Sequence, residues 1–127
     1  MMKSRRPSAG ELEILQVLWE GGPCTVRDVH EKLNRAKPTG YTTVLKLMQI
    51  MADKGLVRRD ETQRAHVYEA RIQRGYAQSQ MVTDLVERAF GGSAARLVMH
   101  ALSSKKSSAA ELAEIRRTLD EMEGRLG

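Results

Sequence analysis

The stretch Thr39–Gly55 restricts the possible fold more than any other, because it predicts one short helix with two unlike faces. Its apolar residues recur at steps of three and four, the spacing of a helix face that packs against a core. They are Val44, Leu47, Met48 and Met51. The other faces carry Thr42, Thr43, Lys46 and Gln49. Such a helix suits a DNA major groove, but solvated amphipathic helices are also common, so the neighbouring segments must decide.

Two more helices are predicted before this one. Ser8–Glu11 has the spacing of a capping box, and Gly21–Pro23 ends the helix that it opens. Thr25–Asp28 opens a second helix in the same way, with Asp in place of the usual Glu. Lys37–Gly40 forms a turn, and the third helix is predicted from about Tyr41 to Lys54.

After Gly55 the pattern becomes strand-like. Leu56–Arg59 and His66–Glu69 are predicted strands, with Val67 as the apolar residue of the second, and they flank the polar segment Glu61–Ala65. Three helices followed by a hairpin predict a winged helix, a helix-turn-helix variant with a β-wing. The predicted fold class is mainly α with this small wing: a DNA-binding domain over residues 1–71 and a helical dimerisation domain over residues 72–127.

Residues 72–127 are predicted to be helical, with a break at Gly91–Ser93. The last helix carries an a/d seam of only about two heptads, too short to be stable alone in water. A second copy of the chain would supply the missing apolar surface, and a monomer that packs back on itself is the alternative. The predicted dimerisation residues are Val82, Leu85, Val86, Leu112, Ile115, Leu119 and Met122.

The charge distribution favours a nucleic-acid partner for the N-terminal half. The net charge is +5, and residues 1–71 carry 13 Lys/Arg against 9 Asp/Glu, whereas residues 72–127 carry 8 against 7. Part of the excess is a basic arm of Lys3, Arg5 and Arg6, for which phosphate contact and disorder are the two interpretations.

Several functional classes are not expected. Cys24 is the only cysteine, which excludes an intrachain disulfide and a thiolate metal cluster and suits a cytoplasmic protein. No apolar run approaches the roughly 18 residues of a membrane-spanning helix. The sequence has no HExxH motif, phosphate-binding glycine loop or nucleophile elbow, so we expect neither an enzyme nor a bound cofactor or metal. An adaptor that uses its winged helix to bind protein is the alternative to a DNA-binding protein.

Candidate DNA contacts lie on the third helix and the wing. A Gln can pair with an adenine edge and a Thr methyl can contact thymine, although phosphate contact is at least as common for Thr and Lys. Arg58, Arg59 and Arg64 frame the wing, where arginine either reaches the DNA or stays solvated. The hydroxyl of Tyr41 could bind phosphate, or its ring could pack on the turn. The predicted DNA-binding residues are Tyr41, Thr42, Thr43, Lys46, Gln49, Arg58 and Arg64.

In order and spacing, six segments resemble the BlaI/MecI family of penicillinase and methicillin-resistance repressors, over nearly the whole chain. They are Glu11–Trp19, Thr25–Val29, Tyr41–Val44, Lys54–Val57, Arg64–Tyr68 and Phe90–Gly92. The resemblance implies a homodimeric transcriptional repressor that binds a pseudo-palindromic operator overlapping a promoter, with a role in antibiotic resistance. It also implies release of repression through a membrane sensor-protease that triggers cleavage in the dimerisation domain. Members with that route are cut at an Asn-Phe bond after the Gly-Gly, and the aligned pair here is His100-Ala101. Copper-responsive relatives carry a C-terminal cysteine motif that this sequence lacks, so copper sensing by that route is not expected.

Overall fold

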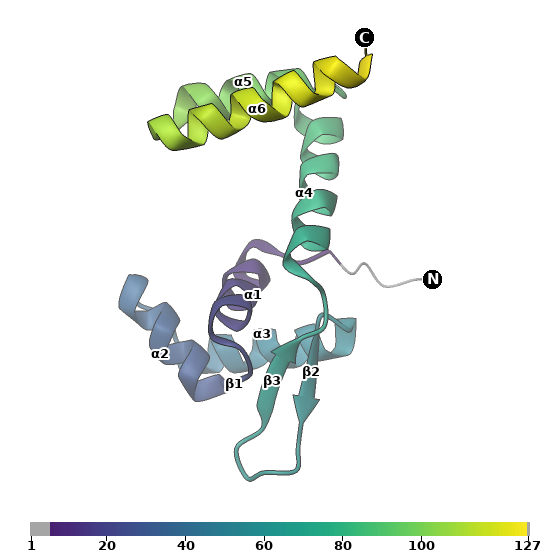
Figure 1. Ribbon diagram of the computed structural model, residues 1–127. Coiled ribbons are helices and arrows are strands. Elements are labelled where there is room, and N and C mark those ends of the chain that lie inside the picture. Colours follow the sequence, from purple (N-terminus) through teal and green to yellow (C-terminus); the bar gives the residue numbers. More distant parts are fainter. Residues whose placement is uncertain (1–5, 127) are drawn as a thin grey trace. The chain divides into compact units, whose positions relative to one another are not determined.

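The computed structural model describes residues 6–126, so Lys3 and Arg5 of the basic arm lie outside the described residues. The chain divides into a first compact unit that ends at Thr83 and a second that begins at Asp84. The first unit contains α1 (Ala9–Gly21), β1 (Cys24–Thr25), α2 (Val26–Ala36), α3 (Tyr41–Lys54), β2 (Val57–Asp60) and β3 (Val67–Ala70) (Figure 1). The division falls within α4 (Arg74–Ala89), and α5 (Ala94–Ser104) and α6 (Ala109–Leu126) complete the second unit.

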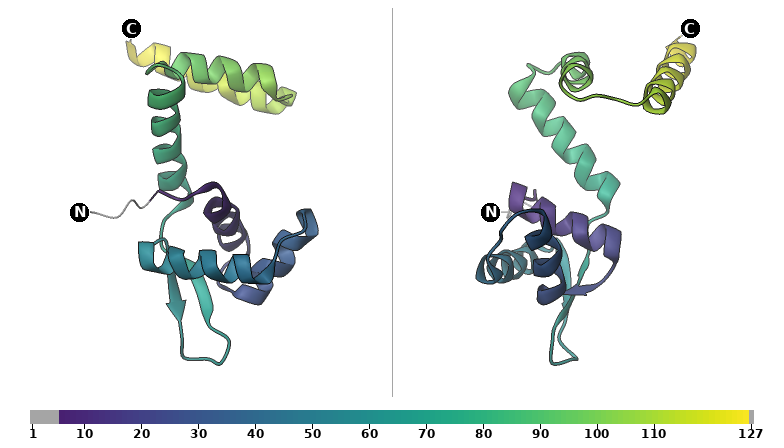
Figure 2. Two further views of the ribbon diagram at one scale, coloured as in Figure 1. Left: turned by 180° about the vertical axis from the view of Figure 1, so that it is seen from behind. Right: turned by 90° about the vertical axis from the view of Figure 1, so that its left-hand side faces the viewer.

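The first unit has the predicted winged-helix architecture. Three helices pack together, and the long antiparallel hairpin β2–β3 forms a wing whose tip projects beyond them (Figure 2). The sheet has a third strand that the sequence did not predict, because β1 pairs with the other edge of β3 in the order β1-β3-β2. Two residues are too few to show an alternating pattern, so only the pairing with β3 reveals this strand.

The helix boundaries follow from the predicted capping signals. Ser8 and Glu11 form a complete capping box at α1, and Thr25 and Asp28 form another at α2. The third helix, α3, differs because it begins after Gly40 with no side-chain cap. It ends at Gly55, whose φ of 80° is the left-handed conformation that glycine adopts most readily.

One apolar core lies between the three helices and the sheet. The predicted inner face of α3 is confirmed, since Val44, Met48 and Met51 are fully buried and Leu47 is half-buried. Tyr68 is the buried residue of β3, whereas Val67, the apolar residue singled out in the sequence, is half-buried. A tyrosine ring can occupy a core when its hydroxyl finds a polar neighbour, and Tyr68 lies opposite Arg59 in the hairpin and helps to raise the pKa of that guanidinium.

A buried ion pair connects the start of α1 with the end of α3. Glu11 is only 2% exposed and is the one buried charged residue in the described part of the chain. Its Oε1 accepts a hydrogen bond from the backbone N–H of Ser8 at 2.8 Å and another from Nζ of Lys54 at 2.9 Å. The capping carboxylate of α1 therefore also holds the C-terminal end of α3.

Replacing Lys54 with Met should lower the free energy of unfolding by about 2–3 kcal/mol, because it leaves the Glu11 carboxylate buried without a cation. Denaturant unfolding followed by circular dichroism measures the change. Lys37→Met is the matched control, since Lys37 and its partner Glu13 are both largely exposed and that pair should contribute less than about 0.5 kcal/mol. Equal losses in the two variants would contradict a structural role for the buried pair.

In its described residues, 84–126, the second unit has no core of its own. No residue of α5 or α6 is buried, and the helices of this unit make few contacts with one another. Gly91 and Gly92, both with positive φ, form the turn before α5, and the ring of His100 packs edge-on against Phe90 at 5.4 Å. The exposed apolar side chains include Leu85, Val98, Met99, Leu112, Leu119 and Met122. Over residues 6–126, no helix has the length and apolar character needed to cross a membrane.

Candidate nucleic-acid interface

A groove of about 630 Å³ lies between α3 and the wing of the first unit. It brings together Tyr41 and Gln49 from α3 with Arg64 from the tip of the wing. These predicted DNA-binding residues are separated in sequence, and the turn of the hairpin places them around one concave surface. Arg27 at the start of α2 and Arg59 of β2 also line the groove, so cations surround it from three elements.

The outer face of α3 is free of the protein core. Its predicted contact residues are all exposed, namely Thr42, Thr43, Lys46 and Gln49. The missing side-chain cap at Gly40 leaves the first backbone N–H groups of α3 available, whereas capping boxes occupy those of α1 and α2. Free N–H groups at the positive end of a helix dipole are well suited to bind a DNA phosphate.

The turn between α2 and α3 is held by polar contacts that sequence reasoning missed. Asn34 Oδ1 accepts a hydrogen bond from the backbone N–H of Thr39 at 2.9 Å, and His30 Nε2 lies 2.7 Å from the carbonyl oxygen of Thr39. The ring of His30 also meets Tyr41 edge-on at 5.6 Å. Tyr41 thus both packs on the turn and remains about half exposed in the groove. These contacts fix the angle between the two helices.

The wing arginines differ in their pairing. Arg58 pairs with Glu69 across the hairpin, and Arg59 pairs with Glu61 at 2.7 Å. Within residues 6–126, Arg64 and Lys46 form no ion pair. An unpaired cation can neutralise a phosphate without first giving up an internal partner, so Arg64 and Lys46 are the best placed of the predicted cations for backbone contact.

Arg58 and Arg59 occupy opposite faces of β2, as successive strand residues do. Arg59 shares the groove with Gln49, whereas Arg58 lies with Glu69 beside Pro23 on the other side. The structure therefore brings Arg58 to a different surface from the other predicted contacts. The sequence predicted a strand over Leu56–Arg59, but it did not show which of the two arginines would face α3.

Asp60 on the wing and Cys24 in β1 have shifted pKa values. The backbone N–H and the hydroxyl of Thr62 donate to Asp60 and hold the pKa of that carboxyl below its ordinary value, which keeps the wing turn closed by a charged acceptor at neutral pH. Burial, followed by the nearby Asp28, raises the pKa of the Cys24 thiol, which makes it less reactive. In the described residues no group of three or more His, Cys, Asp or Glu side chains could hold a metal.

The groove, the exposed face of α3 and the wing define a winged-helix DNA-binding protein. The sequence model of the penicillinase repressor family matches residues 7–121. The chain is 33% identical over 118 residues to "Transcriptional regulator BlaI" of two Mycobacterium tuberculosis strains, CDC 1551 and H37Rv, covering 90% of this chain and 84% of the relative. The solution structure of the DNA binding domain of the repressor BlaI matches with a TM-score of 0.52 and 23% identity, covering 58% of this chain and 90% of that one, which supports the fold.

This chain belongs to the penicillinase repressor family. The family consists of transcriptional repressors and not of enzymes.

Proposed function

We propose that this protein is a homodimeric, cytoplasmic repressor in which residues 1–71 bind an operator and residues 72–127 form the dimer. The observation that carries the DNA-binding part is the uncapped, exposed α3 beside a wing with an unpaired Arg64. Thr42, Thr43 and Gln49 would contact base edges or phosphates in the major groove, while Lys46 and Arg64 neutralise phosphates. Arg58 would contact phosphate only by exchanging its pair with Glu69.

The apolar faces of α4 and α6 support the dimer. Leu112, Leu119 and Met122 lie exposed along α6, with Ile115 half-buried between them, and Val82, Leu85 and Val86 lie along α4. A second copy of the chain with two-fold symmetry can cover both sets. A symmetric dimer presents two α3 helices to two half-sites, which is the reason to expect a pseudo-palindromic operator.

Repression would be released when the dimer is lost, and a membrane sensor-protease pathway of the kind connected with antibiotic resistance would supply the signal. The pair His100-Ala101 lies within α5 and is exposed. Proteases bind extended chain, so α5 must unfold locally before that bond can be cut. Such opening costs little in a helix that buries no residue.

Binding to DNA and its dependence on salt separate the repressor from an adaptor that uses its winged helix for protein contact. Random duplexes retained by the purified protein are sequenced to obtain the operator. Affinity for it is then measured from 50 to 200 mM salt, where a protein that contacts 6–10 phosphates loses about 10³–10⁵-fold. A flat salt dependence and no enriched sequence would favour the adaptor.

Gln49→Ala and Arg64→Ala should weaken binding in different ways. If Gln49 pairs with a base, its loss costs about 1–3 kcal/mol on the operator and relaxes preference at one position. Arg64→Ala should weaken binding to all duplexes and reduce the salt slope by about one. Arg58→Ala, the same charge change on the opposite face of the wing, is the matched control and should have the smaller effect. A loss of binding to every sequence after Gln49→Ala would make Gln49 a backbone contact.

A further inference from the structure

The segment that follows α3 and the segment that precedes α4 are joined by backbone hydrogen bonds. The carbonyl oxygen of Leu56, two residues after α3, accepts from the N–H of Arg71 at 2.9 Å and from the N–H of Ile72 at 3.4 Å. Arg71–Gln73 is the connector between β3 and α4, and Ala77 in the first turn of α4 is fully buried. The proposed DNA-reading helix and the helix that leads to the second unit therefore share one junction.

Trp19 holds this junction from the side of α1. Its indole Nε1 donates to the carbonyl oxygen of Ile72 at 2.9 Å, across 53 residues of sequence. The guanidinium of Arg74, the first residue of α4, lies 5.7 Å from the centre of the indole ring, within the range of a cation–π contact. One side chain thus binds both the connector and the first residue of α4.

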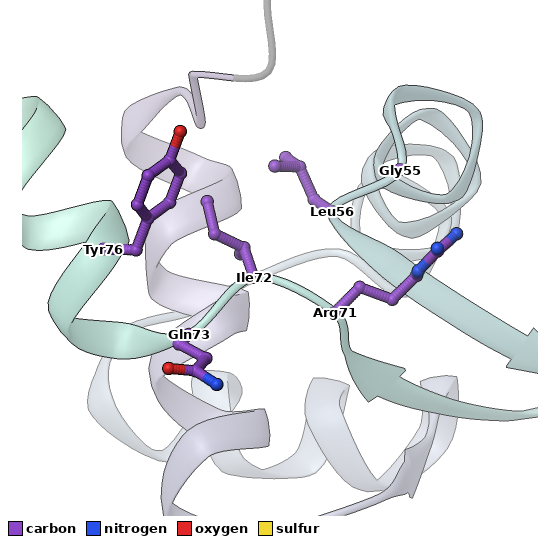
Figure 3. Close-up of a pocket in the computed structure, with 6 residues that line it drawn as sticks. All are labelled: Gly55, Leu56, Arg71, Ile72, Gln73 and Tyr76. Atoms are coloured by element: carbon purple, nitrogen blue, oxygen red, sulfur yellow. The ribbon is translucent and has the colours of Figure 1, made fainter.

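The other side of the junction is incompletely filled by apolar side chains. The side chains of Leu56, Ile72 and Tyr76 converge around a hollow of about 400 Å³, while those of Arg71 and Gln73 point away (Figure 3). Close packing is what normally fixes the position of a helix, and a hollow of this size provides less of it. The polar contacts of Trp19 consequently carry more of the orientation of α4 than they would in a filled junction.

We propose that Trp19 is a positioning residue that sets the direction in which α4 leaves the DNA-binding unit, and thereby the half-site spacing that the dimer accepts. The inference rests on the proposed function, because it needs two half-sites and a dimer. Each added base pair turns a half-site by roughly 35° and moves it by about 3.4 Å, so a rigid junction discriminates between spacings and a loose one does not.

The test uses the full chain and duplexes that carry the selected half-site as inverted repeats, with spacers changed one base pair at a time. The variants are Trp19→Phe, which keeps an aromatic ring without the N–H donor, and Arg74→Ala, which leaves Trp19 in place. Arg88→Ala is the matched control, because it removes the same charge from α4 at a residue that pairs with Asp84 on the same helix and lines no part of the junction. Arg74→Lys should retain most of the spacing preference that Arg74→Ala loses, since lysine also makes cation–π contacts.

We expect the affinity of the unaltered protein for the preferred spacing to exceed its affinity for the adjacent spacings by about tenfold or more. In each junction variant this ratio of affinities should fall to about threefold or less. Affinity for a duplex with one half-site should change by less than about twofold. Trp19 is the only tryptophan, so a shift of its emission in Arg74→Ala reports loss of the cation–π contact.

Two results would overturn the proposal in distinguishable ways. An unchanged spacing ratio in Arg74→Ala and Trp19→Phe, with or without weaker half-site binding, would reduce Trp19 to a core residue while leaving the repressor intact. If the unaltered protein itself showed no spacing preference, the dimer on a two-part operator would be wrong, and the role of Trp19 with it.

Discussion

Replacing Leu119 with Asp should convert the protein to a monomer and lower its affinity for the full operator by more than about 100-fold. Leu119 is 50% exposed on α6 in the single chain, and the proposed dimer would bury it. A carboxylate buried there without a partner is strongly unfavourable, so the subunits should separate. Each winged helix would then bind alone, without the effective concentration that a tethered partner supplies.

Sedimentation and operator binding measure the two parts of this result. Ala113→Asp is the matched control, because Ala113 is exposed on the same helix but lies outside the a/d seam. The winged helix should remain folded in both variants, since none of its core residues comes from α6. An unchanged dimer after Leu119→Asp would place the interface elsewhere.

Cutting the chain after Gly92 should lower the affinity for the operator about as much as Leu119→Asp does. An engineered protease site inserted at this turn lies between α4 and α5, so cleavage removes α5 and α6 from the winged helix. The cut fragment keeps its α3 and wing but loses the tether, and avidity of this kind exceeds single-site affinity by about 100-fold or more. Operator occupancy is measured on the same protein before and after cleavage, so the uncut form is its own control.

Full occupancy by the cut protein would contradict release through loss of the dimer. A small-molecule or redox signal would then be the next explanation, and Cys24 the first residue to test. Its Sγ lies 3.2 Å from the carbonyl oxygen of Gly22, and its raised pKa disfavours the reactive thiolate, so oxidation there should be slow.

The sequence predicted the features that depend on local patterns. The capping boxes at Ser8 and Thr25 and the glycine at Gly55 marked helix ends, because they satisfy backbone groups within a few residues. The apolar period of α3 separated its core face from the exposed Thr42, Lys46 and Gln49. The resemblance to the repressor family followed from the order of these same short segments.

The tertiary structure decided the features that depend on residues far apart in the chain. Glu11 and Lys54 are 43 residues apart, and Trp19 and Ile72 are 53 apart, so no local period signals either contact. The pairing of β1, the burial of Tyr68 and the side of the wing that Arg58 occupies likewise depend on which elements meet across the core. Local hydrogen bonding and periodicity determine where helices and strands form, whereas their packing determines which side chains are buried, paired or left free to contact a partner.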